Sequence, residues 1–465
     1  ITNSSVLPAA SWTHLKDSIY YIQITPTAFY VFQNGIPLHD PGDRAQIYSV
    51  DDLIPNSFYI SGTTLYVWLE DSSHPRDSVM RISPGHIVQL YDCHYTTFDG
   101  LTVEFGGTAF KQQGAATHHV TYRNNTIRSI EHQGIQPVPA NAVIEHNLFQ
   151  KIGVNKYTHG IYTSKPGIII RYNVFEEIAG AGIHLFLQEA PGSPMGGGHY
   201  EIYGNVFRKP RIMTYPTSGN RYYVDMVIWE EGSNLMYNNV FYGEGKRKGI
   251  SLNSPNNRVY HNTFVGSASA IQFHTGKTGN RVFNNIAKDA TSSFLVWPAN
   301  ALPQTLDYNL YDNTSAAPRW ERNGTSYTTF ASYQTAAGEI HSRYSDPLLV
   351  GAADFHLTAS SPAINAGIAL PAEVPMDFEC TTRPQGAGYD IGADEFGPPG
   401  AGCGAASLPG DLNGDGNRNL TDVRWSIEML VGTRPKNLTT ADLNKDGSLT
   451  LADCQALIRL MVGMP

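Results

Sequence analysis

Two short acidic loops near the C-terminus carry the clearest chemistry in the sequence. The segment DLNGDGNRNLTD at 411–422 returns as DLNKDGSLTLAD at 442–453. In each loop, oxygen-bearing residues occupy positions 1, 3, 5, 9 and 12, glycine occupies position 6, and a backbone carbonyl is available at position 7. Hard cations such as calcium prefer this shell, so the spacing predicts two calcium ions. The predicted ligands are Asp411, Asn413, Asp415, Asn417, Asn419 and Asp422 in the first loop, and Asp442, Asn444, Asp446, Ser448, Thr450 and Asp453 in the second.

A second set of residues has side chains suited to work on a polysaccharide. A β-eliminating lyase needs a base for the proton beside a uronate carboxylate and a cation for the resulting enolate. A hydrolase needs a pair of carboxyl groups instead. Each residue taken alone is more often a surface or turn residue. The candidates are Lys111, His159, Tyr162 and His184 for elimination, and Asp225 with Glu230 or Glu231 for hydrolysis.

An internal repeat supplies the elements that would position these residues. Between about residues 95 and 312, phrases such as YRNNTI, IEHNLF, IRYNVF and VYHNTF recur with a unit of about two dozen residues. Short strands joined by turns, without helical periodicity, predict a parallel β-solenoid. One asparagine per unit should stack about 4.8 Å above the last as a structural ladder. These asparagines are Asn125, Asn147, Asn173, Asn205, Asn239, Asn262, Asn285 and Asn309.

Aligning the coils predicts which side chains of one strand face point outward. The alignment uses an inward apolar residue in each coil, with Val227 as that residue in its own coil. Exposed aromatics on this face would equally suit passive sugar stacking. The predicted outward column is Lys111, Gln136, Tyr162, His184, Ile228, Ser251 and Gln272, and a second column two residues further on is Gln113, Val138, Ser164, Phe186, Glu230, Asn253 and His274.

The coil length and the N-[VLT]-F phrase resemble secreted right-handed parallel β-helix proteins, a family rich in polysaccharide lyases and glycosidases. The resemblance implies a right-handed parallel β-helix over 88–340. Residues 1–87 alternate like antiparallel strands and are similar to a small β-module found in some β-helix glycosidases. Phe186 stands where the similar xylosidases carry an acidic nucleophile, which weakens the hydrolase reading.

The phrases SSPAINAG and TRPQGAGYDIGADEF within 341–397 resemble the closing segment of secreted β-helix proteins. We therefore expect this segment to cap the last coil, because an open solenoid end needs a cover. Its polar residues, Asp346, Arg383, Asp390 and Glu395, are expected to fix turns.

The stretch 398–410 is expected to be a linker. After it, each acidic loop is followed by a helical pattern that ends at a glycine, and no helix precedes the first loop. A loop with an exiting helix, found twice within 411–465 and with Asp at position 12, resembles a dockerin module. This resemblance implies calcium-dependent attachment to a cohesin-like domain. The positions that help to choose the cohesin are Leu420, Thr421, Leu451 and Ala452.

The composition limits the partners and the compartment. The net charge of -9 argues against wholesale binding of nucleic acid, and no apolar run reaches membrane-spanning length. Sparse charge and a start at Ile1 without a signal-like segment favour a processed, extracellular or surface-attached protein. The four cysteines fit no metal-binding spacing, and Cys380 could form a disulfide with Cys403.

Three functions remain open from the sequence. The first is a secreted carbohydrate-active enzyme, a lyase before a hydrolase, anchored through the dockerin-like module. The second is a solenoid that binds carbohydrate without catalysis. The third is a structural surface protein that assembles into filaments, its dockerin-like end docking onto the open solenoid end of a neighbouring copy.

Overall fold

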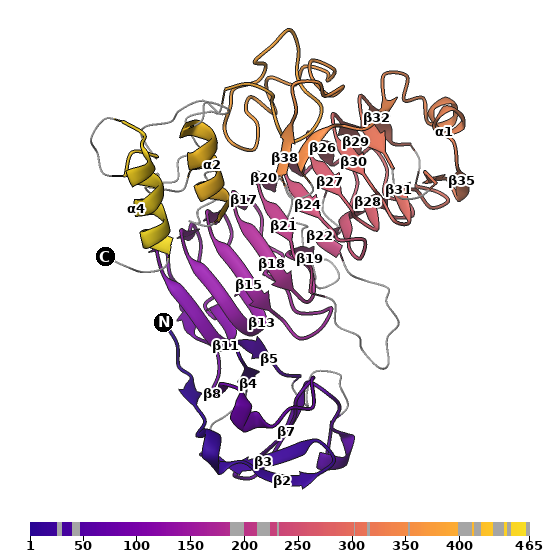
Figure 1. Cartoon of the computed structure of the whole chain (residues 1–465). Coiled ribbons are helices and arrows are strands. Elements are labelled where there is room, and N and C mark those ends of the chain that lie inside the picture. The colour runs from indigo at the N-terminus through magenta and orange to yellow at the C-terminus, as the bar shows by residue number, and fades with distance from the viewer. Residues whose placement is uncertain are drawn as a thin grey trace.

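The computed structural model confirms a mainly β chain built around a parallel β-solenoid (Figure 1). A small β-module packs near one end of the solenoid, and two helices form the C-terminal region. The structure describes residues 1–25, 30–39, 47–186, 200–211, 224–229, 232–301, 303–313, 317–351, 354–398, 412, 420–430, 441–443 and 448–461.

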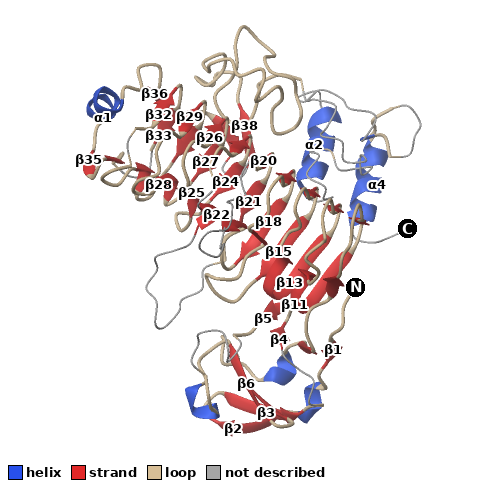
Figure 2. Cartoon of the chain, turned by 180° about the vertical axis from the view of Figure 1, so that it is seen from behind, coloured by secondary structure: helices blue, strands red, loops and turns tan. Residues whose placement is uncertain are grey.

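The strands of the solenoid form three parallel sheets, and Figure 2 shows them following one another along its length. Sheet I contains β10 (Thr97–Asp99), β12 (Thr121–Arg123), β14 (Val143–Glu145), β17 (Ile169–Arg171), β20 (Glu201–Tyr203), β23 (Leu235–Tyr237), β26 (Arg258–Tyr260), β29 (Arg281–Phe283) and β32 (Thr305–Asp307). Sheet II contains the first parts of β11 (Thr102–Gln112) and β13 (Thr126–Gln136), then β15 (Leu148–Ile152), β18 (Val174–Ile178), β21 (Val206–Arg208), β24 (Val240–Tyr242), β27 (Thr263–Val265), β30 (Ile286–Lys288), β33 (Leu310–Asp312) and β36 (Arg343–Tyr344).

Sheet III is the sheet that carries the predicted columns. The long strands β11 and β13 run through the corner from sheet II into it, with a register shift between Gly106 and Thr108. Sheet III contains β9 (Val88–Leu90), the last parts of β11 and β13, β16 (Ile161–Thr163), β19 (Ile183–Phe186), β22 (Val224–Trp229), β25 (Lys248–Asn253), β28 (Ser269–Phe273), β31 (Ser293–Val296) and β34 (Trp320–Arg322).

The predicted asparagine ladder lines the corner between sheets I and II. The Oδ1 atom of Asn147 accepts hydrogen bonds from the backbone N and the Nδ2 of Asn125, at 3.0 and 2.9 Å. The same two bonds join each following pair as far as Asn309, and all eight asparagines are buried. The residue before each one has a left-handed φ between 52° and 64°, which turns the chain at the corner. The structural role predicted for these asparagines is confirmed.

Two further stacks inside the coils were not predicted. Asn234, Asn257 and Asn280 form a second ladder, with Nδ2 to Oδ1 distances of 2.8 and 2.9 Å. A column of parallel phenylalanine rings fills the core at centroid spacings of 4.7 to 4.8 Å, which is the spacing of the coils. The rings belong to Phe149, Phe175, Phe207, Phe241 and Phe264.

The N-terminal module consists of two antiparallel sheets, as its alternation predicts. One contains β1 (Ser5–Val6), β8 (Met80–Ser83), β4 (Tyr30–Gln33) and β5 (Ile36–Pro37), and the other contains β2 (Thr13–Lys16), β3 (Ile19–Gln23), β7 (Thr64–Trp68) and β6 (Ser57–Ser61). The module packs on the corner strands of the solenoid, where the ring of Phe32 meets Phe105 at 5.6 Å. Tyr30 lies against Gly107, at which a Cβ would come within 2.4 Å of its ring, so this contact requires glycine.

The structure differs from the expectation that residues 341–397 cap the last coil. The hairpin of β34 and β35 (Thr325–Tyr327) and the helix α1 (Phe330–Ala337) cover that end, and they bury Trp320 and Tyr333 against the core. Residues 349–393, here called the side segment, include β37 (Leu349–Gly351) and β38 (Asp354–Leu357) and lie along the outside of sheets I and II. They do so because outward apolar residues such as Val240 and Val265 offer them a surface to bury.

The C-terminal helices α2 (Leu420–Leu430) and α4 (Leu451–Met461) pack on one another as a small separate core (Figure 1). Met429 and Leu457 are buried between them. The hydroxyl of Ser426 donates to the Sγ of Cys454 at 3.1 Å. Each acidic loop is thus followed by a helix, as the sequence predicts.

Candidate functional site

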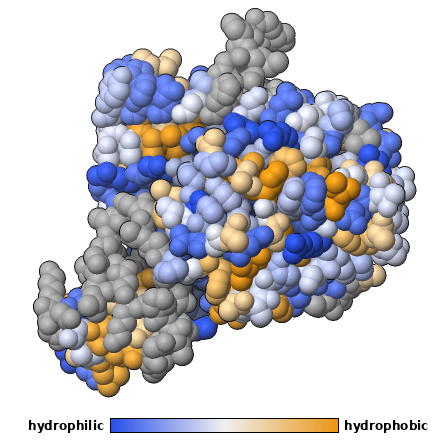
Figure 3. Space-filling model, turned by 90° about the horizontal axis from the view of Figure 1, so that it is seen from above, coloured by the Kyte–Doolittle hydropathy of each residue, from blue (hydrophilic) through white to orange (hydrophobic). Residues whose placement is uncertain are grey.

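On sheets I and II, several outward arginines pair with carboxylates of neighbouring coils. On sheet I, Arg123 pairs with Asp99 at 2.9 Å and Arg171 pairs with Glu145 at 2.6 Å, each pair joining neighbouring coils. On sheet II, Arg128 pairs with Glu104 at 2.8 Å in the same way. In Figure 3, the hydrophobic residues of the surface seen from above lie in separate groups among hydrophilic ones. Ion pairs of this kind are typical of a solvent-exposed surface without a ligand. Sheet III is therefore the candidate for a functional face.

The first outward column of sheet III differs from the predicted one at a single coil. In the second column, Val138 is fully buried in the core, so its predicted outward position is also wrong. His184 pairs with Val227, which is half-buried, while Met226 and Ile228 point inward and are fully buried. The prediction that Ile228 points outward is therefore wrong. Because side chains alternate along a strand, this shift by one residue also changes the second column. The neighbour of Phe186 is Trp229, and not Glu230 as predicted. Glu230 itself, like Glu231, lies outside the described residues.

Four rings meet at the centre of this face. Tyr162 lies beside His184 in the pairing of β16 with β19, and their ring centroids are 5.3 Å apart. Phe186 lies 5.4 Å from Trp229 and 6.3 Å from Tyr162. Trp229 keeps 39% of its surface exposed. We call Tyr162, His184, Phe186 and Trp229 the aromatic cluster; its rings supply flat apolar surfaces of the kind that stack on sugar rings.

His159 lies behind the aromatic cluster. Its ring is buried, accepts a hydrogen bond from the backbone N of Ala181 through Nδ1 at 3.0 Å, and meets Nδ1 of His184 through Nε2 at 2.9 Å. Burial lowers the pKa of His159 well below its usual value and lowers the pKa of His184 to about 4. Both imidazoles are therefore neutral at physiological pH. The structure brings three of the predicted residues, His159, Tyr162 and His184, into one group.

Lysines flank the aromatic cluster along the column. Lys111 reaches toward the next coil, where its Nζ donates to Oε1 of Gln136 at 3.3 Å; Gln136 in turn neighbours Tyr162. On the other side, Nζ of Lys248 donates to Oε1 of Gln272 at 2.6 Å. Burial lowers the pKa of both lysines. Within the described part of the chain neither lysine forms an ion pair, in contrast to Arg123, Arg128 and Arg171 on sheets I and II.

Asp225 does not face the aromatic cluster as a free acid. It occupies the row held by Gly182 and Gly249 in neighbouring coils, is 7% exposed, and pairs with Nε of Arg247 at 2.6 Å. Arg247 also donates to the carbonyls of Ile178 at 3.1 Å and Val224 at 2.7 Å. Burial raises the pKa of Asp225 to about 6, and the guanidinium opposes that rise. Arg247 thus connects neighbouring coils of the solenoid through hydrogen bonds and an ion pair. Sequence reasoning missed Arg247, because nothing in KRKGI distinguishes it from a surface cation.

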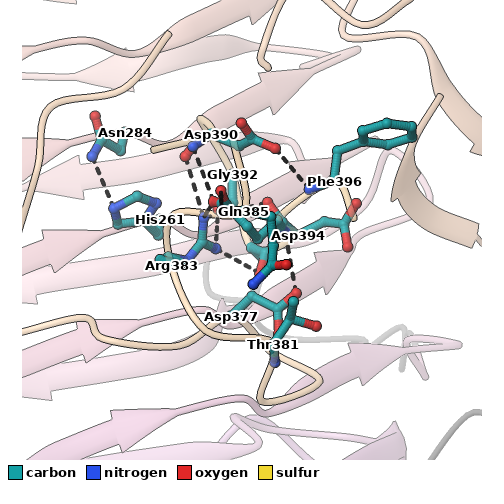
Figure 4. Close-up of polar contacts among 12 residues, drawn as sticks. His261, Asn284, Asp377, Thr381, Arg383, Gln385, Asp390, Gly392, Asp394 and Phe396 are labelled. Atoms are coloured by element: carbon teal, nitrogen blue, oxygen red, sulfur yellow. Dashed lines mark hydrogen bonds and ion pairs between the residues drawn. The ribbon is translucent and has the colours of Figure 1, made fainter. Parts of the chain in front are cut away.

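The polar residues expected to fix turns in the closing phrases do so around Arg383 (Figure 4). Its guanidinium is buried, pairs with Glu395 at 2.9 Å and donates to the carbonyls of Gly392 and Ala393 at 2.9 and 2.8 Å. Asp390 accepts from the backbone N of Phe396 at 2.7 Å. These bonds fold residues 383–396 on themselves.

The described parts of the acidic loops repeat one contact. Asp422 Oδ1 accepts from the backbone N of Leu412 at 2.7 Å, and Asp453 Oδ1 accepts from the backbone N of Leu443 at 2.9 Å. Both carboxylates are buried in the first turn of their helices. Thr450 also donates to Asp453 at 3.1 Å. Two buried carboxylates thus close their loops in the same way, and Asp442 and Ser448 are also described. The predicted ligands outside the described residues are Asp411, Asn413, Asp415, Asn417, Asn419, Asn444 and Asp446.

The cysteines agree with the expectation as far as they are described. Cys380 is disulfide-bonded, and its expected partner Cys403 lies outside the described residues. Cys93 and Cys454 are free thiols. In the part of the chain that the structure describes, no helix is long and apolar enough to cross a membrane.

These features define a β-solenoid with one distinctive face, joined to a paired loop-and-helix region. Residues 409–461 match the family model of the dockerin type I domain, so the chain carries a dockerin type I domain at its C-terminus and the predicted resemblance is confirmed. Dockerin type I domains bind calcium and cohesin partners, and proteins that contain them are typically extracellular.

The remainder of the chain has weaker counterparts. A solved structure described as the complex of XylC with xylose covers 86% of this chain and 88% of its own, with a TM-score of 0.49 and 12% sequence identity. No curated protein matches the sequence significantly.

Proposed function

We propose that this protein binds an acidic polysaccharide along the outward face of sheet III and that its dockerin domain, folded around two calcium ions, holds it on a cohesin-bearing scaffold outside the cell. One observation carries the proposal. Sheet III presents stacked rings and two lysines with no ion pair among the described residues, whereas Arg123 and Arg128 on sheets I and II pair with carboxylates of neighbouring coils.

The geometry suits an extended glycan that crosses the coils. Successive coils stand about 4.8 Å apart, so each offers one contact to a chain lying along the solenoid. The exposed ring of Trp229 and its neighbour Phe186 provide stacking surfaces at the centre. Lys111 and Lys248, on either side, provide charge-assisted hydrogen bonds to uronate carboxylates.

Catalysis by β-elimination is the second candidate, and the lack of a carboxylate in the described part of the column favours it over hydrolysis. In this reaction a base takes the proton beside the uronate carboxylate. The electron pair forms a carbon–carbon double bond as the glycosidic carbon–oxygen bond breaks, and the departing oxygen takes a proton. Lys111 is the candidate base because burial lowers its pKa. Tyr162 is the candidate proton donor because burial raises its pKa and keeps the phenol protonated.

The test is incubation of the full chain with a panel of uronate-containing and neutral polysaccharides. Retention on immobilised acidic polysaccharide, weakened in Lys111→Gln but not in the control Lys16→Gln, supports the binding proposal. Products that absorb in the ultraviolet establish elimination. Reducing ends without that absorbance establish hydrolysis, and retention without products leaves a binding solenoid. Absence of both retention and products from the whole panel overturns the proposal. Calcium-dependent growth of the particle size in light scattering without any partner would instead favour self-assembly.

A further inference from the structure

We propose that the buried ring of His159 fixes His184 in one neutral tautomer, so that His184 donates a hydrogen bond to an oxygen of the bound sugar and is not a general base. The inference rests on the proposed function, because it assigns the sugar a contact at the aromatic cluster. It makes His159 a positioning residue.

The tautomers follow from a chain of hydrogen bonds that begins at the backbone. The N–H of Ala181 can only donate, so Nδ1 of His159, 3.0 Å away, must be the acceptor and carries no proton. The single proton of neutral His159 is then on Nε2. That N–H points at Nδ1 of His184, 2.9 Å away, which must accept. His184 is left with its proton on Nε2.

His159 is itself held from a second direction. Its backbone N donates to Oε1 of Gln133 at 2.7 Å, and Nε2 of Gln133 donates to the carbonyl of Tyr157 at 3.0 Å. Its ring stacks on Tyr162 at 5.6 Å with only 7° between the planes. A residue fixed through its backbone, its ring nitrogens and its ring face cannot swing out to meet a substrate.

The Nε2–H of His184 is the remaining donor of this chain. The atom is buried and, among the residues that the structure describes, has no hydrogen-bond partner. Around it stand the rings of Tyr162, Phe186 and Trp229, at centroid distances of 5.3, 5.8 and 6.4 Å. A buried donor without an acceptor is unfavourable, and a hydroxyl or carboxylate oxygen lying among these rings would satisfy it. The ligand group assigned to this point is therefore an acceptor oxygen.

Protonation of His184 is disfavoured by the same contact. A proton on Nδ1 of His184 would face the N–H of His159. His159 cannot move its own proton from Nε2 to Nδ1, because its Nδ1 accepts the hydrogen bond from the N–H of Ala181. The groups that face His184 are His159 and the phenol of Tyr162, and Arg247 acts on His159 from behind. None of them is a carboxylate that would favour the imidazolium.

The experiment is nitrogen-15 NMR of the histidine rings in the full chain, with and without an acidic oligosaccharide. The expected spectrum shows His184 with its proton on Nε2 and no protonation down to about pH 5. In His159→Leu, which cannot donate to His184, we expect the tautomer to become mixed and the titration midpoint to move toward 6.5. His159→Gln should restore the fixed tautomer, because an amide can accept from Ala181 and donate to His184. The exposed His341→Gln serves as the control.

The outcomes separate this inference from the proposed function. If His184 in the unaltered protein titrates near pH 6.5, or carries its proton on Nδ1, the inference is overturned without any need for a variant. If the tautomer is as expected but no polysaccharide binds, the proposed function fails. If the tautomer is as expected and the polysaccharide binds, sugar affinity should fall about tenfold in His159→Leu and stay within about threefold in His159→Gln. A shift of the His184 Nε2–H proton signal on binding would show the donated hydrogen bond directly. Equal affinities for the two variants would overturn the positioning role.

Discussion

Arg247 and Asp225 form an ion pair within the wall of the solenoid, with Nε of the arginine 2.6 Å from Oδ1 of the aspartate. Arg247 is 1% exposed and also bonds to carbonyls of two other strands. Arg247→Met leaves Asp225 buried without its cation, so we expect the free energy of unfolding to fall by about 3–5 kcal/mol. Arg123→Met, which breaks the exposed pair with Asp99, should cost about 1 kcal/mol or less. Equal midpoint shifts in urea for the two variants would contradict this prediction.

Trp229 is the most exposed ring of the aromatic cluster, and its removal should weaken sugar binding without unfolding the protein. We expect Trp229→Ala to lower affinity for the bound polysaccharide about tenfold, which corresponds to about 1.4 kcal/mol. Tyr95→Ala is the matched control, since Tyr95 is 76% exposed and contacts His118 and His119 at the start of the solenoid. Isothermal titration calorimetry of both variants measures the affinities. An unchanged affinity in Trp229→Ala would contradict the role of Trp229 in sugar binding.

His261 makes the stability of the solenoid depend on pH. It is fully buried, its Nε2 lies 2.8 Å from Nδ2 of Asn284, and burial lowers its pKa well below 6.5. The unfolded chain therefore binds this proton below pH 6.5 while the folded chain does not, so stability is present above that pH and is lost as the pH falls.

The matched variant for this effect is His261→Asn, because asparagine tolerates the left-handed φ of 52° at this position. The stability lost with acidification should be smaller in the variant by about 1 kcal/mol for each pH unit below 6.5. Urea titrations of both proteins at pH 7.5 and 5.5 measure this. Parallel losses in the two proteins would show that His261 is not the group responsible.

The dockerin domain should respond to calcium independently of the solenoid. Removal of calcium with a chelator is expected to reduce the helical signal of α2 and α4 and to abolish cohesin binding, since loop ligands and folding are coupled. Asp453→Ala should remove the response of the second loop and Asp422→Ala that of the first. Circular dichroism with and without calcium measures the effect. Full helicity in the chelated protein would contradict it.

The exposed side chains of the dockerin helices set a separate prediction. Leu451 and Ile458 are 65% and 45% exposed on α4, a position in which apolar residues are normally covered by a partner. Leu451→Asp should weaken cohesin binding by at least about tenfold and leave calcium binding unchanged. Surface plasmon resonance against a panel of cohesins tests this, with Glu201→Gln on the solenoid as the control.

The sequence was most informative where one residue type has one structural use. A buried asparagine after a left-handed residue recurs once per coil, so its period revealed the solenoid and the ladder. The predicted outward column is wrong at Val227 and Ile228, because both residues are apolar and either could face the core. Only the pairing of Val227 with His184 decides between them.

Other features depend on contacts between distant segments and leave little local signal. The side segment covers sheets I and II because their outward apolar residues happen to match its own, and neither sequence alone indicates the other. His159 was found as a candidate, but its role depends on the N–H of Ala181, a backbone group that no residue type reveals.

The side segment also changes how the repeat can come apart. Solenoids commonly lose their coils one at a time, since each coil contacts only its neighbours. Here the side segment spans coils from Asn238 to Leu310, and Cys380 within it touches Tyr172 two coils further back. The N-terminal module reaches as far as the adjoining coil through β5 and β15. With most of the stack bridged from outside, the solenoid is expected to melt as a single cooperative unit, without fraying inward from its ends.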